Sequence, residues 1–204
     1  MNWLAHIFIS KDHIDYQLGN LLADPLKGRS WQGAAVQFQD GLKMHGSIDA
    51  FTDAHALVAR SKARLGEKGY LKGVVIDLAY DYLLLKNWDS YARVGVEPFI
   101  HRFYRDAESA IQCYPDHARH FVSRVIHSNY LTSYGSFAGL AAALQRIDYR
   151  LSARVLARES AQDYLPALRK EMTGIEADFK RFFPDLIDHF KRNAGPSQGM
   201  HWLK

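Results

Sequence analysis

The stretch VVIDLAYDYLLL, from Val74 to Leu85, has the composition of a buried helix because almost all of its residues are apolar. Asp77 and Asp81 interrupt it, and no Lys or Arg occurs among its twelve residues. Residues four apart share one face of a helix, so the two carboxylates would repel each other. An unpaired buried carboxylate is costly or must take up a proton. The stretch therefore predicts a core helix whose two acids need a cationic partner.

The rest of the chain has the same helical character. Apolar periodicity predicts helices at about 2–10, 13–26, 35–53, 55–66, 71–87, 97–113, 117–128, 130–146 and 150–192, the last broken near Pro166, Gly174 or Pro184. No alternating strand, internal repeat or Pro/Gly/Ser-rich linker interrupts the pattern. The expected fold is all-α: a single-domain helical bundle formed by residues 1–193, with residues 194–204 as a flexible C-terminal tail on which Trp202 could dock.

Composition narrows the class of protein. The 204 residues are 48% hydrophobic and 24% charged, which is ordinary for a soluble globular domain. A single cysteine, Cys113, excludes an intramolecular disulfide and favours a reducing cytoplasm. No signal peptide or membrane-spanning run is evident, so no membrane partner is expected. The net charge of +4 suits an acidic partner but is too small to indicate nucleic acid, which is not expected as a partner.

Polar residues also interrupt other apolar helical segments. They are His6 in MNWLAHIFI, Asn20 and Asp24 in LGNLLADPL, and His45, Asp49 and Asp53 in GLKMHGSIDAFTDAH. Within the last two segments the polar residues are four apart, so they share a helix face. Each has an ordinary explanation when taken alone: His6 would be a core histidine, and Asp53 would cap the following helix.

Together with Asp77 and Asp81, these residues predict four helices that each direct His or Asp inward. Nothing cationic in these segments would neutralise so many carboxylates. A divalent metal would, and His with Asp is a ligand mixture suited to Mn²⁺, Fe²⁺, Mg²⁺ or Zn²⁺. The sequence therefore predicts a metal site opposite the two acids of VVIDLAYDYLLL.

The motifs MNWLAH, GNLLAD, MHGSIDAFTD and DLAYDYLL, the last followed by NW, resemble those of the acyl carrier protein phosphodiesterase (hydrolyase) family. The resemblance runs from Met1 to about Trp88 and continues more loosely beyond. It implies an HD-domain-like metal phosphohydrolase that uses Mn²⁺, with Mg²⁺, Fe²⁺ or Co²⁺ as alternatives. The implied reaction hydrolyses the phosphodiester joining 4′-phosphopantetheine to a serine of holo-acyl carrier protein. The adjacent His-Asp pair that names the HD superfamily is absent from this chain.

The candidate residues suit this chemistry. A phosphodiester is an anion that resists water, and a divalent metal both polarises it and lowers the pKa of water from about 15.7 toward 7. The expected metal ligands are Asp24, His45, Asp49, Asp53 and Asp77, and the expected catalytic residues are His6, Asp24 and Asp81. His6 could polarise the phosphate or protonate the departing serine oxygen. Asn20 and Asn2 could orient ligands, and which carboxylate is the base stays open.

The implied protein substrate suggests a docking site. Acyl carrier proteins are small and strongly acidic, so an enzyme acting on one is expected to present basic residues. Lys27 and Arg29, just beyond Asp24, are the expected docking residues.

Two other functions remain compatible with the sequence. An HD-like phosphohydrolase of a nucleotide or another small phosphate ester would share the metal site without a basic docking face. A non-catalytic helical protein could use the same residues for a structural metal or a buried polar network.

Overall fold

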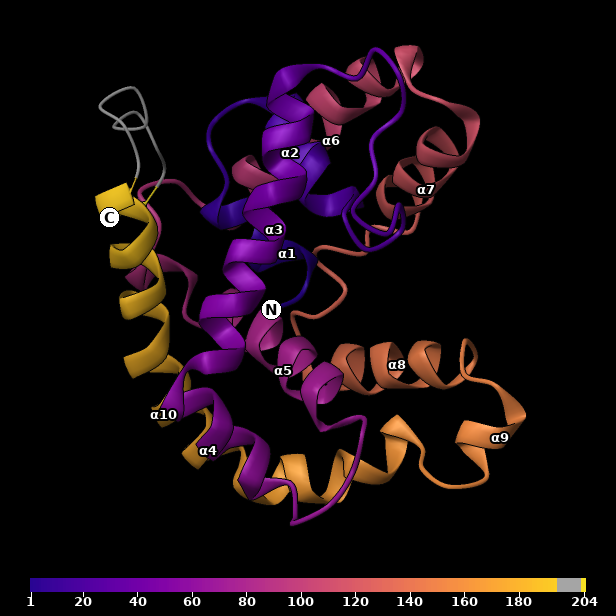
Figure 1. Ribbon diagram of the computed structural model, residues 1–204. Coiled ribbons are helices and arrows are strands. Elements are labelled where there is room, and N and C mark those ends of the chain that lie inside the picture. The colour runs from indigo at the N-terminus through magenta and orange to yellow at the C-terminus, as the bar shows by residue number, and fades with distance from the viewer. Residues whose placement is uncertain (194–202) are drawn as a thin grey trace.

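Helices form the regular structure of the chain over residues 1–193 and 203–204, which are the residues that the computed structural model describes (Figure 1). The α-helices are α1 (Trp3–Ile9), α2 (Ile14–Leu22), α3 (Val36–Ala54), α4 (Ala56–Arg64), α5 (Lys72–Lys86), α6 (Val96–Ala110), α7 (Asp116–His127), α8 (Phe137–Asp148), α9 (Ala153–Leu156) and α10 (Leu165–Asn193). Short 3₁₀ helices are η1 (Trp88–Ser90), η2 (Ile111–Cys113) and η3 (Ala161–Tyr164). No sheet occurs in this part of the chain, so the all-α prediction is confirmed.

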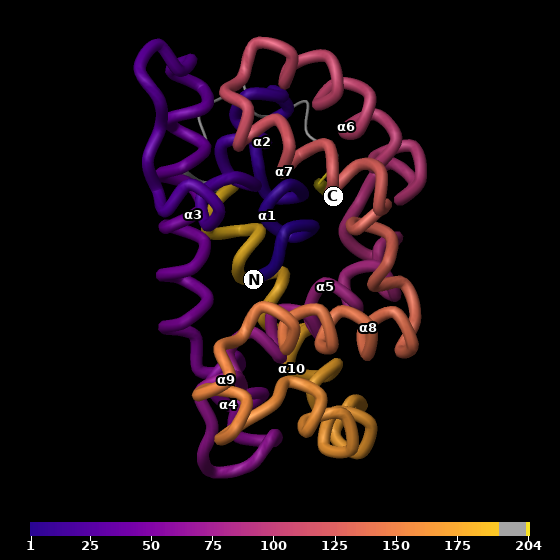
Figure 2. Tube along the Cα trace, turned by 90° about the vertical axis from the view of Figure 1, so that its right-hand side faces the viewer, coloured from indigo at the N-terminus to yellow at the C-terminus, as the bar shows by residue number. Residues whose placement is uncertain are grey.

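The short helix α1 lies in the middle of the molecule, and its residues from Leu4 to Ile9 are all buried. It packs against α2 and α5, and Figures 1 and 2 show the other helices arranged around it. A helix of seven residues is unstable alone, so α1 depends on this packing. The predicted core helix at 74–85 is confirmed as part of α5, whose apolar residues join the same core.

Two glycines let α2 and α3 pack with their backbones in contact. A Cβ added at Gly19 would lie 2.1 Å from the carbonyl oxygen of Phe38, and one added at Gly41 would lie 2.1 Å from that of Tyr16. No other residue type fits at either position without moving a helix. The crossing sets the distance between Asn20, next to Gly19, and His45, one turn beyond Gly41.

The C-terminal helical region differs in part from the predicted single helix at 150–192. The chain forms α9 and η3 first, and α10 begins at Leu165 and continues past Gly174 and Pro184. Asp148 at the end of α8 stabilises the break by accepting hydrogen bonds from the backbone of Ala161 and the hydroxyl of Ser160. The predicted break near Pro166 corresponds to the start of α10 at Leu165. Proline fits there because it is tolerated in the first turn of a helix.

The predicted tail falls mostly on residues 194–202, including Trp202, which lie outside the described residues. Leu203 is buried in the core and pairs with Ala92, and the backbone N–H of Lys204 donates to the Tyr91 carbonyl at 2.8 Å. In the described part of the chain, no helix is both long enough and apolar enough to cross a bilayer.

Candidate active site

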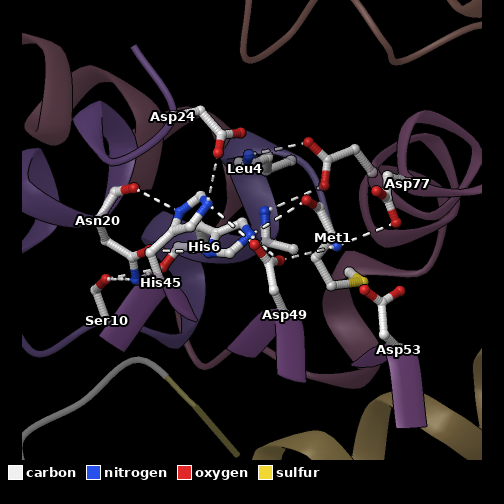
Figure 3. A network of polar contacts seen from close by, with 12 residues as sticks. Met1, Leu4, His6, Ser10, Asn20, Asp24, His45, Asp49, Asp53 and Asp77 are labelled. Carbon is white, nitrogen blue, oxygen red and sulfur yellow. Dashed lines mark hydrogen bonds and ion pairs between the residues drawn. The ribbon is translucent and has the colours of Figure 1, made fainter. Parts of the chain in front are cut away.

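His6 from α1 meets His45 and Asp49 from α3 (Figure 3). The two imidazole rings stack with centroids 4.0 Å apart and planes inclined by 16°. One nitrogen of each ring and one oxygen of Asp49 lie within 4.8 Å of one another. We call these three residues the His-His-Asp cluster.

His45 is held by the backbone of α2. Its Nδ1 lies 2.8 Å from the carbonyl oxygen of Asn20, which can only accept, so Nδ1 carries a proton. Its Nε2 then faces Asp24 Oδ1 at 3.3 Å and Asp49 Oδ2 at 3.1 Å. Neither contact has the alignment of a hydrogen bond, and this buried Nε2 has no hydrogen-bond partner among the described residues.

His6 is oriented in the same way by the side chain of Asn20. The amide nitrogen of Asn20 donates to the His6 carbonyl at 3.0 Å and to the Ser10 hydroxyl at 2.8 Å, which leaves the amide oxygen as acceptor for His6 Nδ1 at 2.8 Å. The Nε2 of His6 lies 3.2 Å from Asp49 Oδ1 and 3.2 Å from the Met1 carbonyl oxygen. Both imidazoles therefore present Nε2 to Asp49.

The two histidines differ in their affinity for a proton. Burial lowers the pKa of His6, and the Asp49 contact does not overcome it. Burial would also lower the pKa of His45, but Asp24 and Asp49 outweigh it and raise the pKa to about 9. Burial would raise the pKa of Asp49, yet its contacts with the two histidines hold it well below the usual range. One proton on His45 thus balances negative charge that a metal ion could balance instead.

The His-His-Asp cluster fits a divalent cation. Two imidazole nitrogens and a carboxylate converge on one point, and the lone pair of a neutral Nε2 would repel the facing carboxylate unless a cation lies between them. The unpartnered Nε2 of His45 is the clearest sign of this fit. Neutral imidazole with carboxylate is a ligand set used for Mn²⁺, Fe²⁺ and Zn²⁺.

Asp77 and Asp81 face the start of α1 and not the His-His-Asp cluster. Asp77 lies 3.1 Å from the α-ammonium group of Met1, which also lies 3.6 Å from Asp49. Asp81 is fully buried and accepts the backbone N–H groups of Leu4 at 2.9 Å and Ala5 at 3.2 Å. The negative charge of this pair thus faces an ammonium group and a helix N-terminus, which favours negative charge, and the predicted metal contact of Asp77 stays a prediction.

The environment of Asp81 explains why it can be buried. Burial raises its pKa to about 7, although the two N–H donors counteract the rise. It supplies the cap that Asn2, at the N-cap of α1, does not make with its own side chain. Asp81 thus caps α1, and its expected catalytic role stays a prediction.

The other predicted residues lie at different distances from the cluster. Asp24 is at its rim with a side chain 76% exposed, and the His45 contact lowers its pKa. Asp53 is 71% exposed and pairs with Lys62 at 2.8 Å, away from the cluster (Figure 3). Lys27 and Arg29 are exposed in the turn after α2. The structure therefore brings His6, Asp24, His45 and Asp49 together.

Two participants were missed by the sequence reasoning. Ser10, the C-cap of α1, follows His6 by four residues and accepts a hydrogen bond from Asn20, a spacing that could have been noticed. The main chain of Met1 contributes both its ammonium group and its carbonyl oxygen, and backbone atoms leave no signal in residue patterns.

Known proteins of one family are similar to this chain over nearly its whole length. An acyl carrier protein phosphodiesterase from Photorhabdus laumondii is 26% identical over 191 residues, covering 92% of this chain and 94% of the relative. One from an Enterobacter species is 27% identical over 192 residues, covering 92% and 96%. No solved structure matches significantly, so the likeness to HD-type folds stays a prediction. The family described as acyl carrier protein phosphodiesterase matches residues 1–186, and this chain belongs to that family.

Proposed function

We propose that this protein is a metal-dependent acyl carrier protein phosphodiesterase that releases 4′-phosphopantetheine from holo-acyl carrier protein. The observation that carries the proposal is the convergence of His6, His45 and Asp49 in a chain whose relatives bear that name. Mn²⁺ is the proposed cation, with Mg²⁺, Fe²⁺ or Co²⁺ as alternatives. The cytoplasm is the proposed compartment, because the single cysteine suits a reducing environment.

The cluster residues would hold the cation, which when bound would polarise the phosphodiester and make water more acidic. Asn20 fixes both imidazoles with Nε2 facing the site, through its side chain for His6 and its carbonyl for His45. This orientation before binding reduces the cost of assembling the site.

Asp24 is assigned as the base because it is the solvent-facing carboxylate beside the cluster. Asp24 is ionised at neutral pH and can accept a proton from the attacking water, although the contact with His45 lowers its pKa and makes it a weaker base. The water oxygen bonds to phosphorus, the bond between phosphorus and the serine oxygen breaks, and the serine oxygen takes up the proton. The products are apo-acyl carrier protein and 4′-phosphopantetheine.

Lys27 and Arg29 are proposed to meet the acidic substrate. Both are exposed near Asp24, and neither has an ion-pair partner within the described ranges. Lys27 and Gly28 have φ angles of 52° and 69°, so the turn reverses the chain directly after Asp24. Their positive charge is therefore available beside the proposed site.

The direct test is incubation with holo-acyl carrier protein and Mn²⁺, with mass spectrometry of the carrier protein. Loss of the phosphopantetheine mass is expected, and prior removal of metal with a chelator should prevent it until Mn²⁺ is restored. A carrier protein that keeps its prosthetic group would contradict the proposed substrate. Full activity after exhaustive chelation would contradict the metal mechanism alone.

A further inference from the structure

The segment between α8 and η3 places positive charge on the surface of the molecule. Residues 149–158, with the sequence YRLSARVLAR, contain three arginines and no acidic residue. Arg150, Arg154 and Arg158 are all exposed, and none of them has an ion-pair partner in the part of the chain that the structure describes. Their guanidinium groups are therefore available to an anionic partner.

Large apolar side chains are exposed beside these charges. Val155 and Leu156 of α9 are exposed, and Tyr149, which follows α8, is 77% exposed. Tyr70, in the turn before α5, is 91% exposed. A single exposed apolar residue is ordinary, but aromatic residues gathered with arginine are typical of a protein–protein interface.

Glu159 fixes Tyr70 next to this segment. Its backbone N–H donates to the Val155 carbonyl at 3.0 Å, and its carboxylate accepts the N–H groups of Tyr70 at 2.8 Å and Leu71 at 2.9 Å. The surface is thus ordered before a partner binds, which reduces the entropy lost on association. We call it the α9 face, and it consists of Tyr70, Tyr149, Arg150, Arg154, Leu156 and Arg158.

Helix α5 leads from the α9 face to the proposed active site. Tyr70 precedes its first turn, and Asp77 lies about 10 Å further along the axis at 1.5 Å per residue. Gly73 and Asp77 share one side of α5, and this side is open, because a Cβ added at Gly73 would meet nothing within 4 Å.

Asp77 connects this side of α5 to the His-His-Asp cluster. It lies 3.1 Å from the α-ammonium group of Met1, which lies 3.6 Å from Asp49 (Figure 3). The carboxylates of Asp77 and Asp49 are both partly exposed. A small protein domain is about 30 Å across, so one such domain can cover both the cluster and the α9 face.

The bond that the proposed reaction breaks requires the carrier protein itself to approach the cluster. This bond joins phosphorus to a serine oxygen of the carrier protein, so the serine and the protein surface around it must reach the enzyme together. The enzyme surface beside the cluster must then accommodate a strongly acidic protein. Unpaired guanidinium groups suit this partner, because each can donate two parallel hydrogen bonds to a carboxylate.

We propose that the α9 face docks the acidic carrier protein while its serine lies at the His-His-Asp cluster. The guanidinium groups of the face pair with carboxylates of the carrier protein, and the exposed apolar side chains pack between these pairs. The inference rests on the proposed function and deepens it, because it assigns recognition of the protein partner to a surface separate from the metal ligands. Lys27 and Arg29 would add a second contact beside Asp24.

The charge of the α9 face is tested by the binding of apo-acyl carrier protein, which has no phosphodiester to cleave. Arg154→Ala with Arg158→Ala should raise Kd about tenfold at low salt, and by less as ionic strength rises. The control is Arg93→Ala with Arg181→Ala, which removes two exposed arginines that have no ion-pair partner among the described residues and lie outside the face. The control pair should change Kd by less than about twofold. Equal losses in both double variants would overturn docking at this face.

The apolar part of the α9 face is tested with Tyr70→Ala, which keeps the backbone N–H that Glu159 accepts. Kd for apo-acyl carrier protein should rise about tenfold at every ionic strength, as for loss of an aromatic anchor from an interface. Val36→Ala is the control, because Val36 is also exposed but lies at the start of α3, outside the face. Both side chains are exposed, so the melting temperature should change little in either variant. Wild-type Kd in Tyr70→Ala, or no binding by the wild-type protein, would overturn the proposal.

A membrane surface and a second copy of this chain are the other partners that such a face could bind. The wild-type protein should not sediment with vesicles of phosphatidylglycerol, and ultracentrifugation should show no dimer that Tyr70→Ala dissociates. Vesicle binding that is lost with Arg154 and Arg158, or a dimer that is lost with Tyr70, would overturn the assignment to the carrier protein.

The proposed function can fail separately. If apo-acyl carrier protein binds at the α9 face and holo-acyl carrier protein is left intact, docking is supported and the hydrolysis is contradicted. If holo-acyl carrier protein is hydrolysed with the same kcat/KM by the wild-type protein and the variants of the face, the hydrolysis is supported and docking is overturned.

Discussion

At the residue scale, Asp49 and Asp81 show how two carboxylates from apolar helices acquire different roles. Asp49 stays ionised because its contacts with His45 and His6 outweigh its burial. Asp49→Asn should therefore abolish Mn²⁺ binding, measured as metal content after dialysis, with little change in melting temperature. Asp53→Asn is the control, because Asp53 pairs with Lys62 and lies away from the cluster. Wild-type metal content in Asp49→Asn would remove Asp49 from the ligand set.

Asp81, in contrast, should matter for stability. Asp81→Ala leaves the buried N–H groups of Leu4 and Ala5 without an acceptor, so the free energy of unfolding should fall by roughly 2 kcal/mol or more. The exposed Asp53→Ala should cost less than about 1 kcal/mol, as for a surface ion pair. Urea titration checks both, and equal effects would contradict the capping role.

His45 should make metal binding depend on pH. Its pKa of about 9 means that Nε2 is protonated at neutral pH, and the proton must leave before a metal can bind there. Apparent Mn²⁺ affinity should accordingly rise about tenfold between pH 7 and 8 and level off above pH 9, because one proton is released per ion below the pKa. Titration calorimetry in buffers of different ionisation enthalpy measures the proton count, and a pH-independent affinity would exclude His45 as a ligand.

At the scale of elements, the crossing of α2 and α3 positions the site. Gly41→Ala would place a Cβ 2.1 Å from the Tyr16 carbonyl oxygen, so α3 would have to move away and carry His45 off Asn20. We expect a lower melting temperature and a loss of kcat of at least about tenfold, because small misplacements of catalytic groups are costly.

A matched control exists on the same helix. A Cβ at Gly46 would meet nothing within 4 Å, so Gly46→Ala should raise stability by about 0.5–1 kcal/mol and keep activity. If both alanine variants behaved alike, close helix packing would not be what positions His45.

At the scale of the whole molecule, net charge and its placement should govern the encounter with an acidic carrier protein. Substituting Lys27 and Arg29 together by Ala should lower kcat/KM for holo-acyl carrier protein by roughly tenfold at low salt. The loss should shrink as ionic strength rises, because the Debye length falls to about 8 Å at physiological salt. Lys170→Ala with Arg181→Ala removes the same charge from α10 and should have a smaller effect. Equal effects would indicate non-specific attraction in place of docking.

Local residue patterns were enough to predict the helical class and the helix face on which each candidate residue lies. Apolar periodicity is a local property, so the core helix at Val74–Leu85 could be predicted from its own residues. The contact between His45 and Asp49 could be predicted in the same way, because residues four apart on one helix are neighbours whatever surrounds them. The sequence also predicts that Asn20 orients ligands, and in the structure Asn20 contacts both imidazoles.

Which inward-facing groups meet depends on how the helices pack against one another. Asp77 and Asp81 share a helix and a spacing with no feature to distinguish them, yet α1 places an ammonium group against the first and a helix N-terminus against the second. His6 comes from that same helix and reaches α3 only because α1 is packed at the centre of the bundle. Contacts between helices depend on crossing points such as the one that Gly19 and Gly41 allow between α2 and α3. The periodicity within one helix carries no information about its neighbour.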